Sequence, residues 1–182
     1  NKKLIALDVG AQGGFLNGSI FAKRYNNFFS PILAEPILSK AQELIEQNYK
    51  VISKGLWSSN CKKKLYFLGK RSGSSSMYKP NEKSFNLYDF KKKDFSLFEI
   101  SEEIDVECTT ISESMKKFNI EYLDFLKIDT QGSELEILKG LGDHSPLMMK
   151  IEVQIVSMYK NVPNWTELLD YIYKRNYMSC EW

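Results

Sequence analysis

Short apolar runs alternate along the chain with longer stretches in which apolar residues recur every three or four positions. Such runs are typical of buried strands, and such stretches are typical of amphipathic helices. The strand-like runs occupy residues 4–9, 32–34, 51–52, 123–128 and 147–153. Because these strands alternate with helices, we expect an α/β fold with a mostly parallel sheet and helices on both faces.

Four positions carry the signal of a helix start, which is Ser, Thr or Asn followed three residues later by Glu or Gln. These pairs are Ser39 with Gln42, Thr110 with Glu113, Ser133 with Glu136, and Asn164 with Glu167. In a capping box the first side chain accepts a hydrogen bond from the third backbone N–H of the helix, and the Glu or Gln bonds back. We therefore expect a helix to begin directly after each of these four positions.

Residues 65–109 interrupt the alternation. They hold two strand-like segments, "KLYFLG" and "IDVECT", with a polar loop and the basic run 91–93 between them. A chain of 182 residues can bury the core of one domain, so we expect a single domain over 1–182 with an insertion at about 65–109. Because the chain does not begin with Met, we expect that terminal segments of the natural protein lie outside it.

Composition narrows the class of protein. Hydrophobic residues at 43% and charged residues at 26% are ordinary for a globular domain. A net charge of +2 gives no electrostatic footprint for nucleic acid or an anionic membrane, and no apolar run approaches the roughly 20 residues of a membrane span. The three cysteines form no CxxC pair, so we expect free thiols in a reducing, cytoplasmic compartment.

The ends of the predicted strands are unusually acidic. In a parallel α/β sheet, ligands bind beyond the carboxyl ends of the strands, where the strand order reverses. The residues that end or follow the predicted strands are Asp8, Glu35, Gly55, Asp129 and Glu152. Four of these five are acids, which a buried strand does not need, so the sequence predicts a binding site at this edge.

A glycine-rich turn, "LDVGAQGG" at residues 7–14, lies between the first strand and a first helix. Glu35 follows 21 residues after Gly14, a placement that suits a carboxylate binding both hydroxyls of a ribose. That arrangement fits NAD as well as S-adenosylmethionine. The glycine spacing departs from GxGxxG, however, and the charge of Asp8 at the turn would repel a pyrophosphate and attract an ammonium or sulfonium group. The turn therefore favours S-adenosylmethionine.

Five segments together resemble one enzyme family. They are "LDVGAQGGFLNG", "AEP", "GLWSS", "SGSSSMYKP" and "LDFLKIDTQGSELEILKGL". In order and spacing they are similar to the FkbM-type methyltransferases, from about residue 4 to residue 159. The resemblance implies a Rossmann-like class I methyltransferase sheet, S-adenosylmethionine as the cofactor, and methylation of a hydroxyl group.

The resemblance also implies roles for the cofactor-binding residues. Asp8, Gly10 and Gly14, with Gln12 in the same turn, would surround the methionine part of the cofactor. Glu35 would bind the ribose, Gly55 and Leu56 would flank the adenine, and Asp129 would lie beside the methyl group. No metal is expected, because the sequence holds no trusted metal-ligand spacing.

For catalysis, Asp129 is the candidate that accepts the proton of the acceptor hydroxyl or orients it, with Glu134 and Glu152 nearby. Ser75, Ser76 and Tyr78 of the inserted segment would contact the acceptor, a carbohydrate or a secondary metabolite. Simpler explanations stay open: Asp129 and Glu134 suit a helix N-terminus, Glu152 suits solvent at a strand end, and the insertion suits a flexible lid.

Two other functions also stay open. One is a nicotinamide-dependent oxidoreductase. The other is a non-catalytic module of the same fold that binds the cofactor or a glycan.

Overall fold

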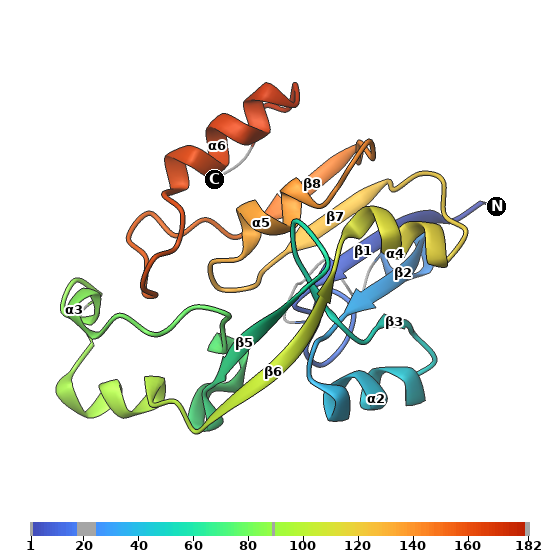
Figure 1. Ribbon diagram of the computed structural model, residues 1–182. Helices are drawn as coiled ribbons and strands as arrows, with labels where there is room; N and C mark the ends of the chain where they lie inside the picture. The colour runs from blue at the N-terminus through green and yellow to red at the C-terminus, as the bar shows by residue number, and fades with distance from the viewer. Residues whose placement is uncertain (1, 18–24, 89, 181–182) are drawn as a thin grey trace.

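A computed structural model describes residues 2–17, 25–88 and 90–180 of the chain (Figure 1). Within these residues, five parallel strands form one sheet in the order β3-β2-β1-β7-β8. They are β1 (Leu4–Val9), β2 (Phe29–Ala34), β3 (Lys50–Ile52), β7 (Phe125–Ile128) and β8 (Met148–Ile151). Each overlaps one of the apolar runs, so the expected α/β fold with a parallel sheet is confirmed.

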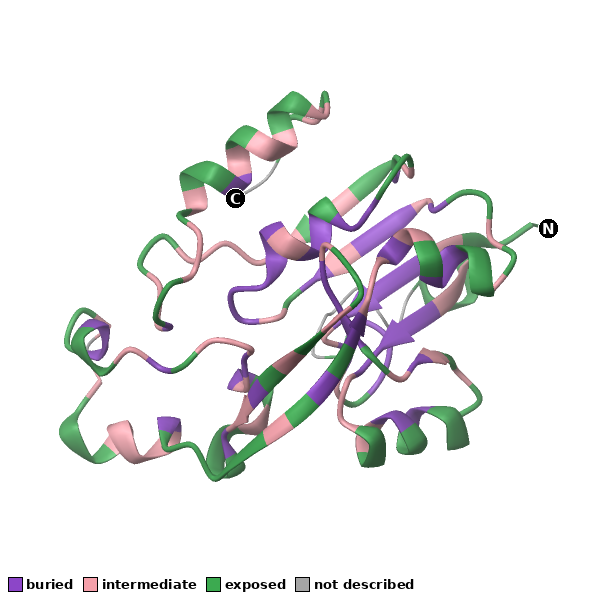
Figure 2. Cartoon of the chain, viewed as in Figure 1, coloured by how far each residue is buried: buried purple, intermediate pink, exposed green. Residues whose placement is uncertain are grey.

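Helices cover both faces of this sheet. They are α2 (Leu38–Glu46), α4 (Ile111–Lys117), α5 (Glu134–Lys139) and α6 (Trp165–Lys174). Successive strand residues point to opposite faces, so Ala6 and Leu33 pack with Leu44 of α2 on one side. Leu7 and Leu126 pack with α4 and α5 on the other side. The central strands are accordingly buried along most of their length (Figure 2).

Two of the predicted helix caps are confirmed. The Thr110 side chain accepts a hydrogen bond from the Glu113 backbone N–H at 3.0 Å, at the start of α4. At the start of α6 the complete capping box is present, with Asn164 and Glu167 each accepting from the backbone of the other. At these two helix starts, local sequence decided the boundary.

The other two caps are wrong. Helix α2 begins at Leu38, one residue before Ser39, because its N-cap is Ile37 and the Ile37 N–H donates to Glu35 Oε1 at 2.9 Å. Helix α5 does begin after Ser133, but this residue has φ −89° and ψ 3° and makes no cap hydrogen bond. An N-cap side chain reaches the helix backbone from an extended conformation, which Ser133 does not have.

The insertion forms a second, smaller sheet in the order β4-β6-β5. Strands β5 (Cys61–Phe67) and β6 (Glu102–Thr109) pair antiparallel, and both were predicted. The two-residue strand β4 (Gly55–Leu56) pairs with the end of β6. Gly55 therefore belongs to the inserted sheet and does not end β3, which corrects its expected position.

Between β5 and β6 the chain folds around its own aromatic cluster. This stretch contains η2 (Gly69–Ser74), α3 (Glu82–Phe85) and η3 (Lys92–Phe98). Phe85 and Phe98 are buried with ring centroids 4.4 Å apart, and Phe90 packs edge-on against both rings. This cluster is separate from the two that line the main sheet, so the insertion has a small core of its own.

Some expectations concern parts of the chain other than the sheets. The helix expected after the glycine turn falls on residues 18–24, which lie outside the described residues. Cys61, Cys108 and Cys180 all carry free thiols, as predicted. Among the described helices, none combines the length and the apolar character that a membrane span requires.

Candidate functional site

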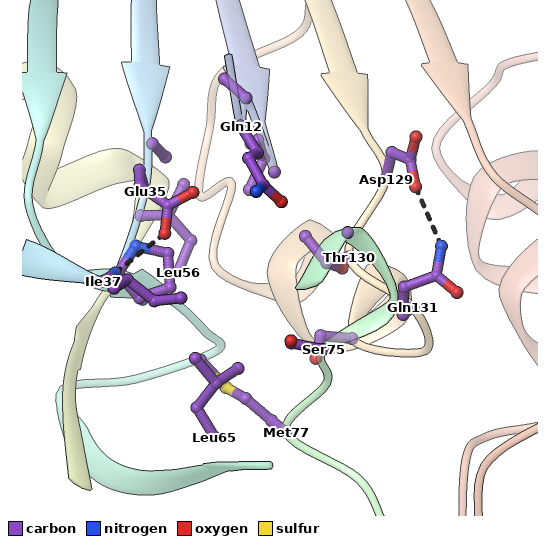
Figure 3. Close-up of a pocket in the computed structure, with 18 of the residues that line it drawn as sticks. Gln12, Glu35, Ile37, Leu56, Leu65, Ser75, Met77, Asp129, Thr130 and Gln131 are labelled. Atoms are coloured by element: carbon purple, nitrogen blue, oxygen red, sulfur yellow. Dashed lines mark hydrogen bonds between the residues drawn. The ribbon is translucent and has the colours of Figure 1, made fainter. Parts of the chain in front are cut away.

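A cavity of about 480 Å³ lies beyond the carboxyl ends of β1, β2 and β7, with the inserted segment on its far side (Figure 3). Strands β1 and β7 are adjacent, and the strand order reverses between them, which is where ligands bind in such sheets. The volume is in the range of small-molecule sites. The predicted site residues that line it are Gly10, Gln12, Gly14, Glu35, Gly55, Leu56, Ser75 and Asp129.

The glycine turn lies directly against the end of β7. Gly10 has φ +81°, and its N–H donates to the Ala34 carbonyl at 3.2 Å. A Cβ at this position would overlap the backbone carbonyl oxygen of Asp129. Only glycine allows both this conformation and this close approach. The turn therefore brings the ends of β1 and β7 to one cavity.

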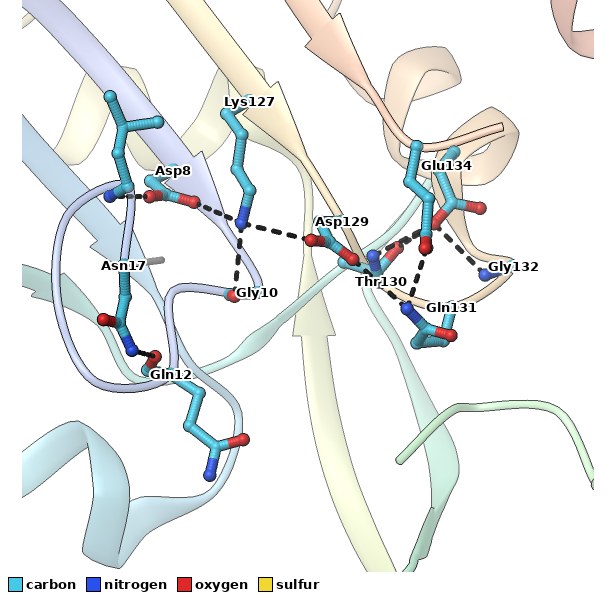
Figure 4. A network of polar contacts seen from close by, with 12 residues as sticks. Asp8, Gly10, Gln12, Asn17, Lys127, Asp129, Thr130, Gln131, Gly132 and Glu134 are labelled. Atoms are coloured by element: carbon cyan, nitrogen blue, oxygen red, sulfur yellow. Dashed lines mark hydrogen bonds and ion pairs between the residues drawn. The ribbon is translucent and has the colours of Figure 1, made fainter. Parts of the chain in front are cut away.

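Asp8 lies beneath the cavity and not at its mouth. Its side chain is completely buried, and its Oδ2 accepts a hydrogen bond from the Leu16 N–H at 2.7 Å. Its Oδ1 is 3.0 Å from the Lys127 ammonium nitrogen (Figure 4). Burial raises the pKa of Asp8, and the neighbouring Lys127 charge lowers it in part.

This ion pair corrects the expectation that the charge of Asp8 would repel a pyrophosphate at the turn. Lys127 lines the cavity and lies 3.7 Å from the Asp129 carboxylate as well, so the charge of Asp8 is balanced locally. A pyrophosphate would not meet an uncompensated Asp8 here. The signal for this pair was in the sequence, since Lys127 is the one charged residue in the strand "FLKI", but it was missed.

Glu35 lies at the opposite end of the cavity from Asp129 (Figure 3). Its side chain is only 4% exposed, and burial raises its pKa. The Ile37 N–H donates to one carboxylate oxygen, which fixes the side chain where the chain leaves β2 for α2. The carboxylate is thus held on the wall of the cavity with further acceptor capacity.

Asp129 and Glu152 follow neighbouring strands, but only Asp129 lines the cavity. The Asp129 side chain is 45% exposed, so its carboxylate is accessible there. Gln131 connects the two acids: its Nε2 donates to Asp129 Oδ1 at 3.2 Å and to Glu152 Oε2 at 2.8 Å. Burial, together with the charge of Asp129, raises the pKa of Glu152 to about 7.

Glu134, one of the three predicted catalytic acids, binds the loop between β7 and α5. It is buried and does not line the cavity. Its Oε1 accepts from the Thr130 N–H and hydroxyl, both at 3.0 Å, and from the Gly132 N–H at 3.1 Å. This oxygen therefore holds the loop between β7 and α5. Among the described residues, no three His, Cys, Asp or Glu side chains come together as a metal-binding group.

Of the three predicted acceptor contacts, Ser75 alone lines the cavity. The buried Ser76 hydroxyl donates to the Gln131 carbonyl at 2.7 Å and accepts from the Tyr78 N–H at 3.0 Å. The Tyr78 ring packs beside Trp57, and burial raises the pKa of Tyr78 to about 12. Ser76 and Tyr78 therefore join the insertion to the site without facing the cavity.

The comparison with protein families now decides the identity. The family model described as the methyltransferase FkbM domain matches residues 8–178, nearly the whole chain. The chain belongs to the FkbM methyltransferase family. The comparisons with curated proteins and with solved structures gave no significant match.

As an FkbM methyltransferase the protein is an enzyme that uses S-adenosylmethionine. The residues around the cavity fit this cofactor. One observation supports the fit: Ser133 lines the cavity and is 1% exposed, and its buried hydroxyl has no hydrogen-bond partner within the described residues. A buried hydroxyl without a partner is unfavourable, so a polar group of a ligand is expected beside it.

Sequence reasoning missed much of the lining of this methyltransferase's cavity. The missed residues come from strand ends, from the loop after β7 and from the insertion. They include Ile37, Leu65, Ser72, Lys127, Thr130, Gln131 and Ser133. For the insertion no local pattern marks which side chains face inward, because its contacts with the main sheet join residues far apart in the chain.

Proposed function

We propose that this methyltransferase transfers a methyl group to a hydroxyl of a carbohydrate or a secondary metabolite, and that residues 1–182 form one catalytic domain. The cofactor supplies an electrophilic methyl group on a sulfonium. As the O–CH₃ bond forms, the S–CH₃ bond breaks with its electron pair left on sulfur, and the acceptor's O–H bond must give up its proton. Asp129 accepts that proton or orients the hydroxyl.

The observation that carries this proposal is the position of Asp129. Its carboxylate is accessible in the cavity, at the strand end where the order of strands reverses. Methyl transfer depends mainly on holding the nucleophile in line with the methyl group, so an oriented carboxylate at this place suits the reaction. Lys127 and Gln131 hold that carboxylate from two sides.

The same cavity offers a place for each part of the cofactor. The turn with Gly10, Gln12 and Gly14 would surround the methionine part, above the ion pair of Asp8 and Lys127. The Glu35 carboxylate would accept hydrogen bonds from the ribose hydroxyls. Gly55 and Leu56 would flank the adenine, and Ser133 would donate to or accept from a polar atom of the cofactor.

The acceptor would enter from the side of the insertion. Ser72, Gly73, Ser75 and Met77 line the cavity opposite the strand ends. The Gln12 side-chain amide donates to the Ser72 hydroxyl at 2.8 Å, which joins the glycine turn to the insertion. Serine hydroxyls beside an apolar Met side chain suit a polyhydroxyl ligand, which presents both hydroxyls and C–H groups.

Calorimetry and a transfer assay test the proposal. S-adenosylhomocysteine should bind the wild-type protein, and NADH should not. Transfer of a tritiated methyl group from S-adenosylmethionine to a panel of sugars and hydroxylated small metabolites should identify an acceptor. In Asp129→Asn, transfer should fall about 100-fold or more, as expected for loss of a general base. Binding of S-adenosylhomocysteine should change by less than about tenfold.

Equal transfer by Asp129→Asn and the wild type would refute the role of Asp129. Binding of NADH with no binding of S-adenosylhomocysteine would refute the assignment of the cavity to the cofactor.

A further inference from the structure

Gln131 occupies an unusual place in the loop between β7 and α5. Its side chain is buried, at 8% exposure, yet it carries two donor hydrogens, and both go to carboxylates. Its Nε2 donates to Asp129 Oδ1 at 3.2 Å (Figure 4). The same nitrogen donates to Glu152 Oε2 at 2.8 Å. One amide group thus bridges an acid that lines the cavity and an acid that lies behind it.

The surroundings of Gln131 fix the orientation of its amide. Its Oε1 accepts a hydrogen bond from Gln154 Nε2 at 3.1 Å and lies 3.2 Å from the Tyr159 hydroxyl. Gln154 is itself oriented, since its Oε1 accepts from the Met158 N–H at 3.4 Å. With donors on its oxygen side, the amide must present its NH₂ group to the two carboxylates.

The backbone of Gln131 is held as well. It has φ +61°, a left-handed conformation that side-chain-bearing residues seldom adopt. Its carbonyl oxygen accepts from the Ser76 hydroxyl at 2.7 Å, so the inserted segment supports the conformation. Strain that is held in place by contacts from two distant segments is typical of functional sites.

The electrostatics around Glu152 explain what the bridge does. Glu152 faces the Asp129 and Glu134 carboxylates, and the phenols of Tyr88 and Tyr159 lie within electrostatic reach of it. Burial and the Asp129 charge raise its pKa to about 7, while the hydrogen bond from the Gln131 amide lowers it in part. The two acids repel each other, and the Gln131 donor offsets part of that repulsion.

We propose that Gln131 is a positioning residue for methyl transfer, because its oriented amide bridges Asp129 and Glu152 and keeps the Asp129 carboxylate directed at the cavity. This inference rests on the role proposed above for Asp129. Glu152 accepts the second hydrogen bond of the amide from behind the cavity, and it does not itself touch the acceptor. Tyr159 and Gln154 contact Gln131 Oε1, so they act only by orienting the amide.

The first test is a titration that needs no acceptor. The protein is labelled with ¹³C at the side-chain carboxyls of Asp and Glu, and the Glu152 and Asp129 signals are followed by NMR from pH 4 to pH 9. In Gln131→Met, which keeps the length of the side chain and removes both donors, the Glu152 midpoint should rise by about one pH unit. Gln131→Leu also removes both donors and adds no charge, so it serves if the Met variant does not fold.

The matched control is Gln42→Met. Gln42 makes a side-chain hydrogen bond to Glu46 on the exposed side of α2 and does not line the cavity. This variant should leave the titration of Glu152 at its wild-type midpoint. A purely structural Gln131 would change the unfolding midpoint and leave the titration unchanged, and that outcome would overturn the proposal.

The second test uses an acceptor identified in the sugar panel. Gln131→Met should lower kcat by about 10- to 100-fold, as expected for a misaligned reacting group, and change KM for S-adenosylmethionine by less than about threefold. A rise in KM alone would overturn the proposal. If the wild type methylates no compound in the panel, the proposed function fails, whereas the titration still decides the role of Gln131.

Discussion

Glu35→Gln separates binding of the cofactor from stability of the fold. The substitution keeps the shape of the side chain and one carbonyl oxygen, so the Ile37 N–H at 2.9 Å still has an acceptor. It removes the charge and replaces one acceptor oxygen by a donor NH₂ group. If Glu35 binds the two ribose hydroxyls, one hydrogen bond to a charged group is lost, which is worth about 1.5–3 kcal/mol.

That loss corresponds to a Kd for S-adenosylhomocysteine about 10- to 100-fold higher than in the wild type. Isothermal titration calorimetry at pH 8 measures it. Glu46→Gln, on the exposed side of α2, is the matched control and should bind as the wild type does. Equal affinities of Glu35→Gln and Glu46→Gln would refute the ribose assignment.

The same Glu35→Gln substitution should stabilise the cofactor-free protein. Burial raises the pKa of Glu35 above its ordinary value of 4.5, so the folded protein holds this proton more tightly than the unfolded chain. The charged form therefore costs stability, and the cost grows as the pH rises through the raised pKa. Glu35→Gln should increase the free energy of unfolding at pH 8 and change it little at pH 4, as measured by urea denaturation. A less stable variant at pH 8 would refute this reasoning.

Three further substitutions test other parts of the site. Ser133→Ala removes a buried hydroxyl without a partner, so the cofactor-free protein should keep its melting temperature while the Kd for S-adenosylhomocysteine rises about 5- to 10-fold by calorimetry; an unchanged Kd would refute the contact. Lys127→Met leaves Asp8 buried and unpaired and should cost about 3–5 kcal/mol at pH 8 by urea denaturation. The cost should be smaller at pH 5 than at pH 8, because burial raises the pKa of Asp8 and the variant lacks the Lys127 charge that lowers it. An added Asp8→Asn should restore part of the stability; equal losses at both pH values would contradict the ion-pair argument. Gly10→Ala meets the Asp129 carbonyl at a positive φ and should lower stability by about 2–4 kcal/mol in thermal unfolding, and a wild-type melting temperature would contradict it.

The parallel sheet could be predicted because its strands are short apolar runs buried on both faces, a local property of the sequence. The caps at Thr110 and Asn164 were predictable for the same reason. Ser39 failed because the Glu35 side chain captures the Ile37 N–H and the helix starts earlier. A local pattern cannot show that a side chain from the preceding strand end competes for the same backbone groups.

The positions of Gly10, Glu35 and Asp129 on one cavity followed from the rule for strand ends, and the structure brings them together. The partners of Asp8 and the tasks of Glu134 and Ser76 did not follow. Each depends on a contact that the tertiary fold creates, such as the ion pair with Lys127. Sequence spacing indicates which residues reach an edge, but it does not show which of their lone pairs the fold has already used.

The aromatic cluster of Phe85, Phe90 and Phe98 has a consequence for how this enzyme can diversify. The insertion packs around these rings and so has a core that the parallel sheet does not supply, while Ser72 and Ser76 bond to Gln12 and Gln131 on the other side of the cavity. One wall of the cavity is therefore shaped by the packing of the strands and the other by the packing of the insertion. Substitutions at Gly73, Ser75 or Met77 would change which molecules fit on the proposed acceptor side while the strand ends that would hold the cofactor stay as they are.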